Sequence, residues 1–206
     1  MIYLMRHGHE DEGFIGGWSD THLTQKGVNE SVNARNFIVN KGLVINKILS
    51  SDITRAKETA RIINSKLNVP LEITKLLNEQ DKGIINGIPL QMAEEYYSEF
   101  INTEDIYKRF PEGESLSDFY NRILYYYHDI LKEDNTLLVT HSGVINMIYY
   151  ILTNTKLGYN KKGFNVTHSS IHEYDPTLKK IKRIYPEKQY IMRTNWPTIL
   201  QKWALK

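Results

Sequence analysis

Short apolar segments of strand length alternate with longer segments of helical periodicity along most of this chain. Helices between consecutive strands return the chain to the same end of a sheet, so those strands pair in parallel. A parallel sheet must be covered on both faces. The sequence therefore predicts the α/β class, as a three-layer α/β/α sandwich with a mostly parallel sheet. The predicted strands are Ile2–Met5, Lys47–Ser50, Leu71–Leu77, Thr136–Thr140, Ile171–Tyr174 and Lys179–Tyr185, and the predicted helices are 24–42, Thr54–Leu67, 115–131 and Gly143–Leu152.

The clearest helical signal begins at Ser115. Ser115 and Asp118 have the spacing of a capping box, which satisfies backbone donors at a helix start. An apolar stripe at helical spacing follows, so we expect a helix packed on the sheet with its tyrosines in the core. The stripe contains Leu116, Phe119, Tyr120, Ile123, Leu124, Tyr127, Ile130 and Leu131.

One domain is expected over residues 1–206, because the sequence shows no repeat, linker or low-complexity tract. A chain of 206 residues with 41% hydrophobic residues can bury a full core. Residues 80–114 fit the alternation poorly and are predicted to be a partly helical insertion over the sheet edge and the active site. In the C-terminal tail, 186–206, Trp196 and Trp203 are expected to anchor the segment.

Composition narrows the chemistry. The chain has no cysteine, which excludes disulfides, thiolate zinc sites and a cysteine nucleophile. The apolar run at the start is too short for a signal peptide, and Val144–Leu152 is too short to span a bilayer. We therefore expect a cytoplasmic protein without membrane or nucleic-acid partners. Residues 156–206 carry 11 Lys and Arg against 3 Asp and Glu, which we interpret as a solvated face rather than an anion-attracting rim.

Two of the predicted parallel strands end in histidine motifs. Arg6-His7-Gly8-His9 follows the first strand, and Thr140-His141-Ser142-Gly143 follows the strand at 136–140. A third strand leads into Arg55 at the start of a helix. Ligands of such sheets bind beyond the carboxyl ends of the strands. The fold thus gathers two histidines and two arginines at one edge.

This set suits phosphoryl transfer. A neutral imidazole can attack phosphorus and hold the phosphoryl group covalently, which divides one difficult step into two. Arg6 and Arg55 offer bidentate donors to phosphoryl oxygens, and Gly8 would let the backbone pass close to the bound group. The leaving alkoxide needs a proton from a carboxylic acid, which then acts as base on water.

Several motifs occur in the order typical of the histidine phosphatase superfamily, and the chain resembles its phosphoglycerate mutase-like branch over nearly its whole length. The resemblance implies the fold of that branch. The motifs are Arg6-His7-Gly8, Gly17-Trp18-Ser19-Asp20 with Leu23-Thr24 and Gly27, Ser51-Asp52-Ile53-Thr54-Arg55-Ala56, Leu77-Asn78-Glu79, Pro111-Glu112-Gly113-Glu114-Ser115-Leu116, and Val139-Thr140-His141.

By position, the resemblance implies that His7 is the nucleophile, that Arg6, Arg55 and His141 hold the phosphoryl group, and that Glu79 is the proton donor. It implies neither a metal nor an organic cofactor. Asp81 and Glu10 remain rival acids. The expected substrate-binding residues are Gly8, His9, Glu10, Trp18 and Ser142.

The loop after His7 departs from the family pattern. His9, Glu10 and Gly13 replace the usual polar residues, and the loop is shorter and more acidic. The leading interpretation is a metal-independent phosphatase that acts on a small phosphate monoester. A phosphoglycerate mutase is the alternative. It is disfavoured because 206 residues are few for that branch and because the stretch between Gly87 and Pro111 has only Lys108 and Arg109 as basic residues.

Two further interpretations stay open. The His-x-His of residues 7–9 can ligate a metal, with His22 or an aspartate completing the site, although the arginines then lack a role. A phosphate sensor that retains the pocket is the non-enzymatic possibility. His168 and His172 are expected to be structural residues that flank the late strands.

Overall fold

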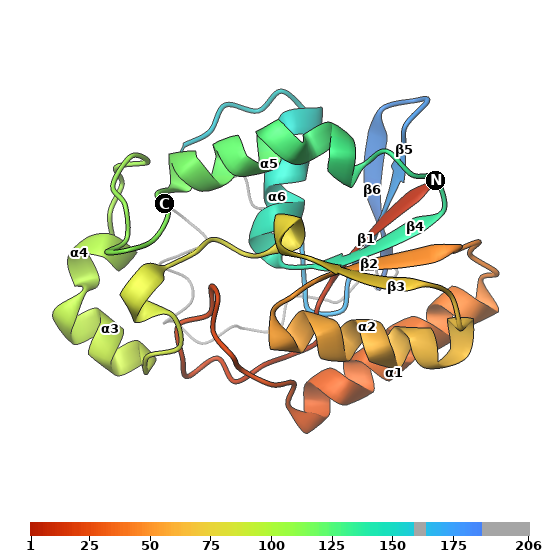
Figure 1. Ribbon diagram of the computed structural model, residues 1–206, viewed down its shortest axis with the longest axis horizontal. Helices are drawn as coiled ribbons and strands as arrows, with labels where there is room; N and C mark the ends of the chain where they lie inside the picture. Colours follow the sequence, from red (N-terminus) through yellow and green to blue (C-terminus); the bar gives the residue numbers. More distant parts are fainter. Residues whose placement is uncertain (159–163, 187–206) are drawn as a thin grey trace, which may run out of the picture.

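The computed structural model describes residues 1–158 and 164–186, and within them a six-stranded sheet lies at the centre (Figure 1). The strand order is β3-β2-β4-β1-β5-β6. The first four strands in this order pair in parallel, whereas β5 is antiparallel to both β1 and β6. The mostly parallel α/β sandwich is thus confirmed. The strands are β1 (Ile2–Arg6), β2 (Lys47–Ser51), β3 (Leu71–Thr74), β4 (Thr136–Thr140), β5 (Ile171–Asp175) and β6 (Lys180–Tyr185).

Helices cover both faces of the sheet. The two layers are α1 (Gln25–Asn40) with α2 (Thr54–Leu67), and α5 (Leu116–Ile130) with α6 (Ser142–Leu152) (Figure 1). Side chains of β1 alternate between the faces, as the pleat requires. Ile2 and Leu4 join the core under α5 and α6, while Tyr3 and Met5 join the core under α1 and α2. The central strands are therefore buried on both faces and hold their carboxyl ends rigidly.

The helix caps follow the sequence. Thr24 caps α1 by accepting from Gly27 N, and Gly42 ends that helix with a φ of +62°. Ser115 and Asp118 form the predicted capping box. The predicted strand over Leu71–Leu77 is partly wrong, because the chain turns into a 3₁₀ helix, η1 (Lys75–Leu77), after Thr74 caps Leu76 N.

The stripe of α5 is buried along its centre but not at its margins. Phe119 and Ile123 are fully buried. Tyr120 and Tyr127 are only partly buried. Leu124 is 44% exposed, which corrects its predicted core position. An apolar stripe wider than the sheet contact leaves its edge residues in solvent.

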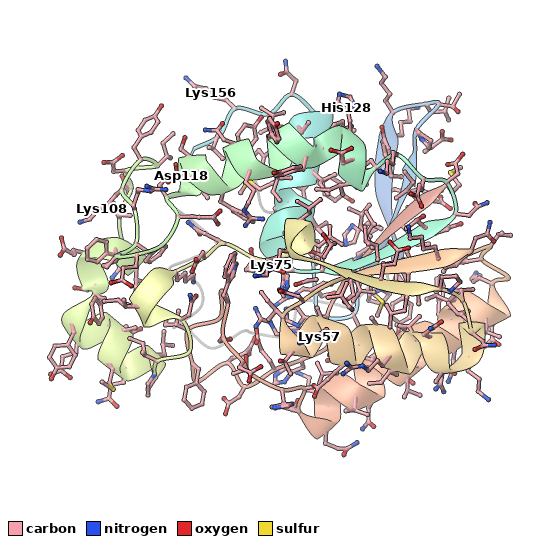
Figure 2. All side chains as sticks on the ribbon, viewed as in Figure 1. Lys57, Lys75, Lys108, Asp118, His128 and Lys156 are labelled. Carbon is pink, nitrogen blue, oxygen red and sulfur yellow. The ribbon has the colours of Figure 1, made fainter. Side chains whose placement is uncertain are left out.

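Residues 80–114 contain η2 (Gly83–Ile85), α3 (Leu90–Tyr96) and α4 (Ser98–Ile101), and these helices lie beyond one end of the sheet (Figure 1). A small apolar cluster joins this insertion to Ile15 of the β1–α1 loop. The insertion also meets the start of α5, where Arg109 Nε lies 2.7 Å from Oδ2 of Asp118. Figure 2 labels Asp118 at this end of α5. The loop after β1 is therefore fixed by the insertion.

The tail with Trp196 and Trp203 lies outside the described residues. Within residues 1–158 and 164–186, every helix is too short or too polar to cross a membrane.

Candidate active site

The strand register brings the two motif histidines together. Arg6 of β1 pairs with Thr140 of β4, so the next residue on each strand is a histidine at the same edge. His7 N donates to Thr140 O at 2.9 Å, and the ring centroids of His7 and His141 are 5.0 Å apart. Both side chains are buried.

Hydrogen bonds define the tautomer of His7. Its Nδ1 lies 2.7 Å from Gly8 O. A carbonyl oxygen only accepts, so Nδ1 carries the proton. Burial, and then the nearby His141, Arg55 and Arg6, lower the pKa of His7 well below its ordinary value. His7 is therefore neutral at physiological pH. Its unprotonated Nε2, which accepts from Arg55 Nε at 3.3 Å, is the ring nitrogen that can act as a nucleophile.

Arg55 is held at the first turn of α2 by the loop after β1. The side chain is 1% exposed. Its Nη2 donates to Gly17 O at 2.8 Å, and its Nη1 donates to Ser19 Oγ at 3.1 Å. Arg55 Nε lies 3.3 Å from His7 Nε2. The guanidinium is thus aimed at the atom that would receive a phosphoryl group.

Arg6 is held by residues that are remote in sequence. Its Nη1 donates to Val166 O at 3.0 Å, and its Nη2 lies 2.7 Å from His168 Nε2. Burial, and then Arg6, lower the pKa of His168 to about 3, so this ring is neutral and accepts the bond. Sequence reasoning gave His168 only a structural role. No sequence signal links two residues separated by 162 positions.

His141 is oriented by a chain of hydrogen bonds. Ser51 Oγ donates to Asn78 Oδ1 at 2.8 Å and therefore accepts from His141 Nε2 at 2.9 Å. His141 Nδ1 is buried and has no partner among the described residues. Burial, followed by Arg55 and Arg6, lowers the pKa of His141 well below its usual value. A bound phosphate dianion would favour the protonated ring, with Nδ1 as a donor.

The carboxylate of Glu79, a residue that follows η1, lies at the N-terminal end of α6. Its Oε2 accepts from Gly143 N at 3.0 Å, and its Oε1 accepts from Gln80 N at 3.0 Å. Arg122 supports this segment from α5 by donating to Glu79 O at 3.0 Å. The rival acid Asp81 is occupied by Gly83 N at 2.8 Å and does not line the cavity described below.

The other rival acid, Glu10, lies beside Arg55 and His7. Glu10 Oε2 is 3.0 Å from Arg55 Nε and accepts from Thr21 Oγ1 at 2.8 Å. Glu10 Oε1 is 4.0 Å from His7 Nε2. A carboxylate therefore pairs with Arg55, one of the two arginines expected from the sequence to hold a phosphoryl group.

A cavity of about 350 Å³ opens from these groups. Its walls include six of the candidate residues, namely Arg6, His7, Glu10, Arg55, Glu79 and Ser142. His141 does not line the cavity, and its ring centroid is 5.0 Å from that of His7. The remaining three, Gly8, His9 and Trp18, do not line the cavity.

Each of these three residues has a different neighbour. The open side of Gly8 faces α1, because a Cβ there would lie 2.4 Å from Gly27 O, so the glycine serves helix packing rather than close approach to a ligand. His9 Nδ1 lies 2.9 Å from Thr24 Oγ1. Trp18 is 39% exposed and donates through Nε1 to Glu79 O at 2.7 Å. It thus fixes the backbone of the candidate acid.

The described residues do not supply the ligands that a metal ion at the His-x-His motif would need. His22 is 70% exposed and bonds Glu58 at 2.6 Å, and no group of three His, Asp or Glu residues in 1–158 and 164–186 could hold an ion. His172 is buried away from the cavity, between Tyr149 Oη at 2.8 Å and Ser170 Oγ at 3.0 Å.

Comparison with known proteins places this geometry in context. The family model described as the histidine phosphatase superfamily (branch 1) matches residues 2–185. A 6-phosphofructo-2-kinase/fructose-2,6-bisphosphatase 1 of Rattus norvegicus is 31% identical over 153 residues, which cover 71% of this chain but only 31% of that relative. The chain therefore spans about a third of that protein.

Two other similarities involve proteins of comparable length. A 2,3-bisphosphoglycerate-dependent phosphoglycerate mutase of Beijerinckia indica is 29% identical over 168 residues, covering 74% of this chain and 80% of the relative. The crystal structure of an alpha-ribazole phosphatase from Shigella flexneri superposes with a TM-score of 0.72 at 23% identity, covering 88% of this chain and 93% of the other. The second similarity concerns the fold alone.

Proposed function

The chain belongs to the histidine phosphatase superfamily (branch 1), and we propose that it is a metal-independent phosphatase of small phosphorylated metabolites. The observation that carries this proposal is the neutral His7, whose Nδ1 is bonded to Gly8 O while Nε2 meets Arg55 at 3.3 Å. Its relatives include a protein with a bisphosphatase in its name and a mutase. We also propose that it acts in the cytoplasm.

In the first step, His7 Nε2 attacks phosphorus and the bond to the ester oxygen breaks. Arg6 and Arg55 neutralise the phosphoryl oxygens, and His141 donates a further hydrogen bond once it is protonated. Glu79, in its carboxylic acid form, gives its proton to the departing alkoxide. The products are phospho-His7 and the free alcohol.

In the second step, water attacks the phosphoryl group and the N–P bond breaks. The Glu79 carboxylate takes a proton from this water, so one residue serves as acid and then as base. Inorganic phosphate leaves and His7 Nε2 regains its lone pair. Throughout, Gly8 O holds Nδ1–H, which keeps the reactive nitrogen pointed toward Arg55.

The test is hydrolysis of p-nitrophenyl phosphate by the wild type and by His7→Ala, each with and without EDTA. We expect activity that survives EDTA and is lost in His7→Ala. Activity lost to EDTA would contradict metal independence, and wild-type rates in His7→Ala would contradict the nucleophile. Phosphate binding without turnover would indicate a sensor.

A phosphoglycerate mutase is the alternative, and the identity to the Beijerinckia enzyme favours it. Charge opposes it. Apart from Arg6 and Arg55, Lys82 is the only cation among the described residues that line the cavity, whereas a phosphoglycerate carries a second anionic group. Turnover of 3-phosphoglycerate that depends on a bisphosphate primer would establish the mutase.

A further inference from the structure

We call the part of the cavity lined by Arg6, His7 and Arg55 the phosphoryl end. Beyond it, the cavity has an apolar wall formed mainly by two helices. Leu116 and Phe119 come from α5, Met147 and Tyr150 come from α6, and Leu157 follows α6. Gly16 and Gly17 of the β1–α1 loop also line the cavity. An apolar wall favours a leaving group with a hydrophobic face.

Two polar atoms of this wall have no hydrogen-bond partner within residues 1–158 and 164–186. Asn146 Oδ1 and Tyr150 Oη are both buried and both unpaired among the described residues. They lie four positions apart on α6, and therefore on one face of the helix. Tyr150 is only 3% exposed. Native proteins pair nearly all buried polar atoms, so two unpaired atoms on one cavity wall indicate a ligand with matching groups.

Charge on the wall restricts that ligand further. Lys82 is the only cation among the described lining residues outside the phosphoryl end. Its Nζ lies 5.8 Å from the centroid of the Phe110 ring. The described residues of the wall include no arginine that could bind a second phosphate or a carboxylate in a bidentate manner. An uncharged leaving group fits better than an anionic one.

We propose that the site takes monophosphates of uncharged, ring-bearing alcohols that present a hydrogen-bond donor to Asn146 and an acceptor to Tyr150. The proposal rests on the phosphatase function above and names its substrate class. The ring packs against Phe119, and the polar edge of the ring reaches α6. Burial raises the pKa of Tyr150, which keeps its hydroxyl protonated as a donor at neutral pH.

The experiment compares kcat/KM for three probes, namely uridine 5′-monophosphate, 1-naphthyl phosphate and 3-phosphoglycerate. The wild type should prefer both ring probes to 3-phosphoglycerate by at least about tenfold. Tyr150→Phe and Asn146→Leu should each lower kcat/KM for uridine 5′-monophosphate by about 5- to 10-fold, the range for one neutral hydrogen bond. Their kcat/KM for 1-naphthyl phosphate should stay within about twofold, because that ring offers no such partner.

Tyr149→Phe is the matched control. It removes a tyrosine hydroxyl from the preceding residue. Tyr149 Oη bonds His172 Nδ1 at 2.8 Å and does not line the cavity. It should lower Tm and leave the ratio between probes unchanged.

Preference for 3-phosphoglycerate, or equal losses on all probes in Tyr150→Phe and Asn146→Leu, would overturn the proposal. Phosphoenzyme formed with p-nitrophenyl phosphate is measured in the same preparations. If no phosphoenzyme forms, the phosphatase proposal fails. If it forms without the predicted selectivity, only the substrate class fails.

Discussion

Replacing Gly143 with alanine should move the proton donor while leaving the residue Glu79 itself unchanged. An added Cβ would lie 2.0 Å from Glu79 Oε1 and 2.9 Å from Phe119 Cε1. Nonbonded contacts of a Cβ are rarely under 3.0 Å, so the carboxylate must move by about 1 Å. Its hydrogen bond from Gly143 N, now 3.0 Å, would bend or break.

A displacement of this size is large for proton transfer. Misplacing a catalytic group by about 1 Å lowers the rate by roughly 10²-fold, equivalent to about 2.7 kcal/mol in the barrier. An alkyl phosphate has a poor leaving group and needs the proton, so its kcat/KM should fall by about that factor. An aryl phosphate has a good leaving group, so its kcat/KM should fall by less than about fivefold.

The assay is steady-state and burst kinetics with an alkyl phosphate and with p-nitrophenyl phosphate. Because Glu79 also activates water, Gly143→Ala should show a burst of p-nitrophenolate followed by slow turnover. Gly13→Ala, on the exposed part of the β1–α1 loop, controls for the added methyl group. Equal losses of kcat/KM on both substrates, or unchanged hydrolysis of the alkyl phosphate, would refute the assignment of Glu79 as the acid.

Three further predictions concern charge and protonation. Glu10→Gln removes the carboxylate that lies 3.0 Å from Arg55 Nε, so inorganic phosphate should inhibit about 3- to 10-fold more tightly at low salt; weaker inhibition would contradict a competing role. His168→Leu removes the acceptor of Arg6 and should lower kcat/KM by about 10- to 100-fold, with partial rescue in His168→Gln; a fall in Tm alone would indicate a purely structural residue. Burial lowers the pKa of His172 to about 4, below the unfolded value of about 6.5. Its stabilisation is therefore complete above pH 6.5 and is lost as the pH falls toward 4, by up to roughly 3 kcal/mol. Tm measured against pH should fall more steeply in the wild type than in His172→Gln, and parallel curves would contradict this.

The fold was predictable because its signals are local. The strand–helix alternation, the Thr24 cap and the Ser115 capping box each depend on residues within one helical turn or one strand. The predictions from sequence were wrong where tertiary contacts determine the local structure or the burial of a side chain. Leu124 continues the helical stripe but lies beyond the sheet contact, at 44% exposure. The apolar run after Thr74 turns into a 3₁₀ helix, which lets Asn78 bond Ser51 and orient His141.

The site was predictable in part. His7 and His141 come together because adjacent parallel strands end side by side, which the topology implies. The neighbours of the two arginines could not be predicted from the sequence. His168 reaches Arg6 across 162 positions, and Glu10 meets Arg55 only because the β1–α1 loop folds back onto α2. Asn146 and Tyr150 look like ordinary residues of an apolar helix until the cavity beside them is known.

The most direct test of the account is to trap the phosphoenzyme. Wild type, His7→Ala and Glu79→Gln are mixed with p-nitrophenyl phosphate, quenched at alkaline pH after milliseconds, and mapped by peptide mass spectrometry. We predict acid-labile phosphate on His7 in the wild type, more of it in Glu79→Gln because hydrolysis is slowed, and none in His7→Ala. Turnover with no phosphate on His7, or with phosphate on another residue, would contradict the central claim.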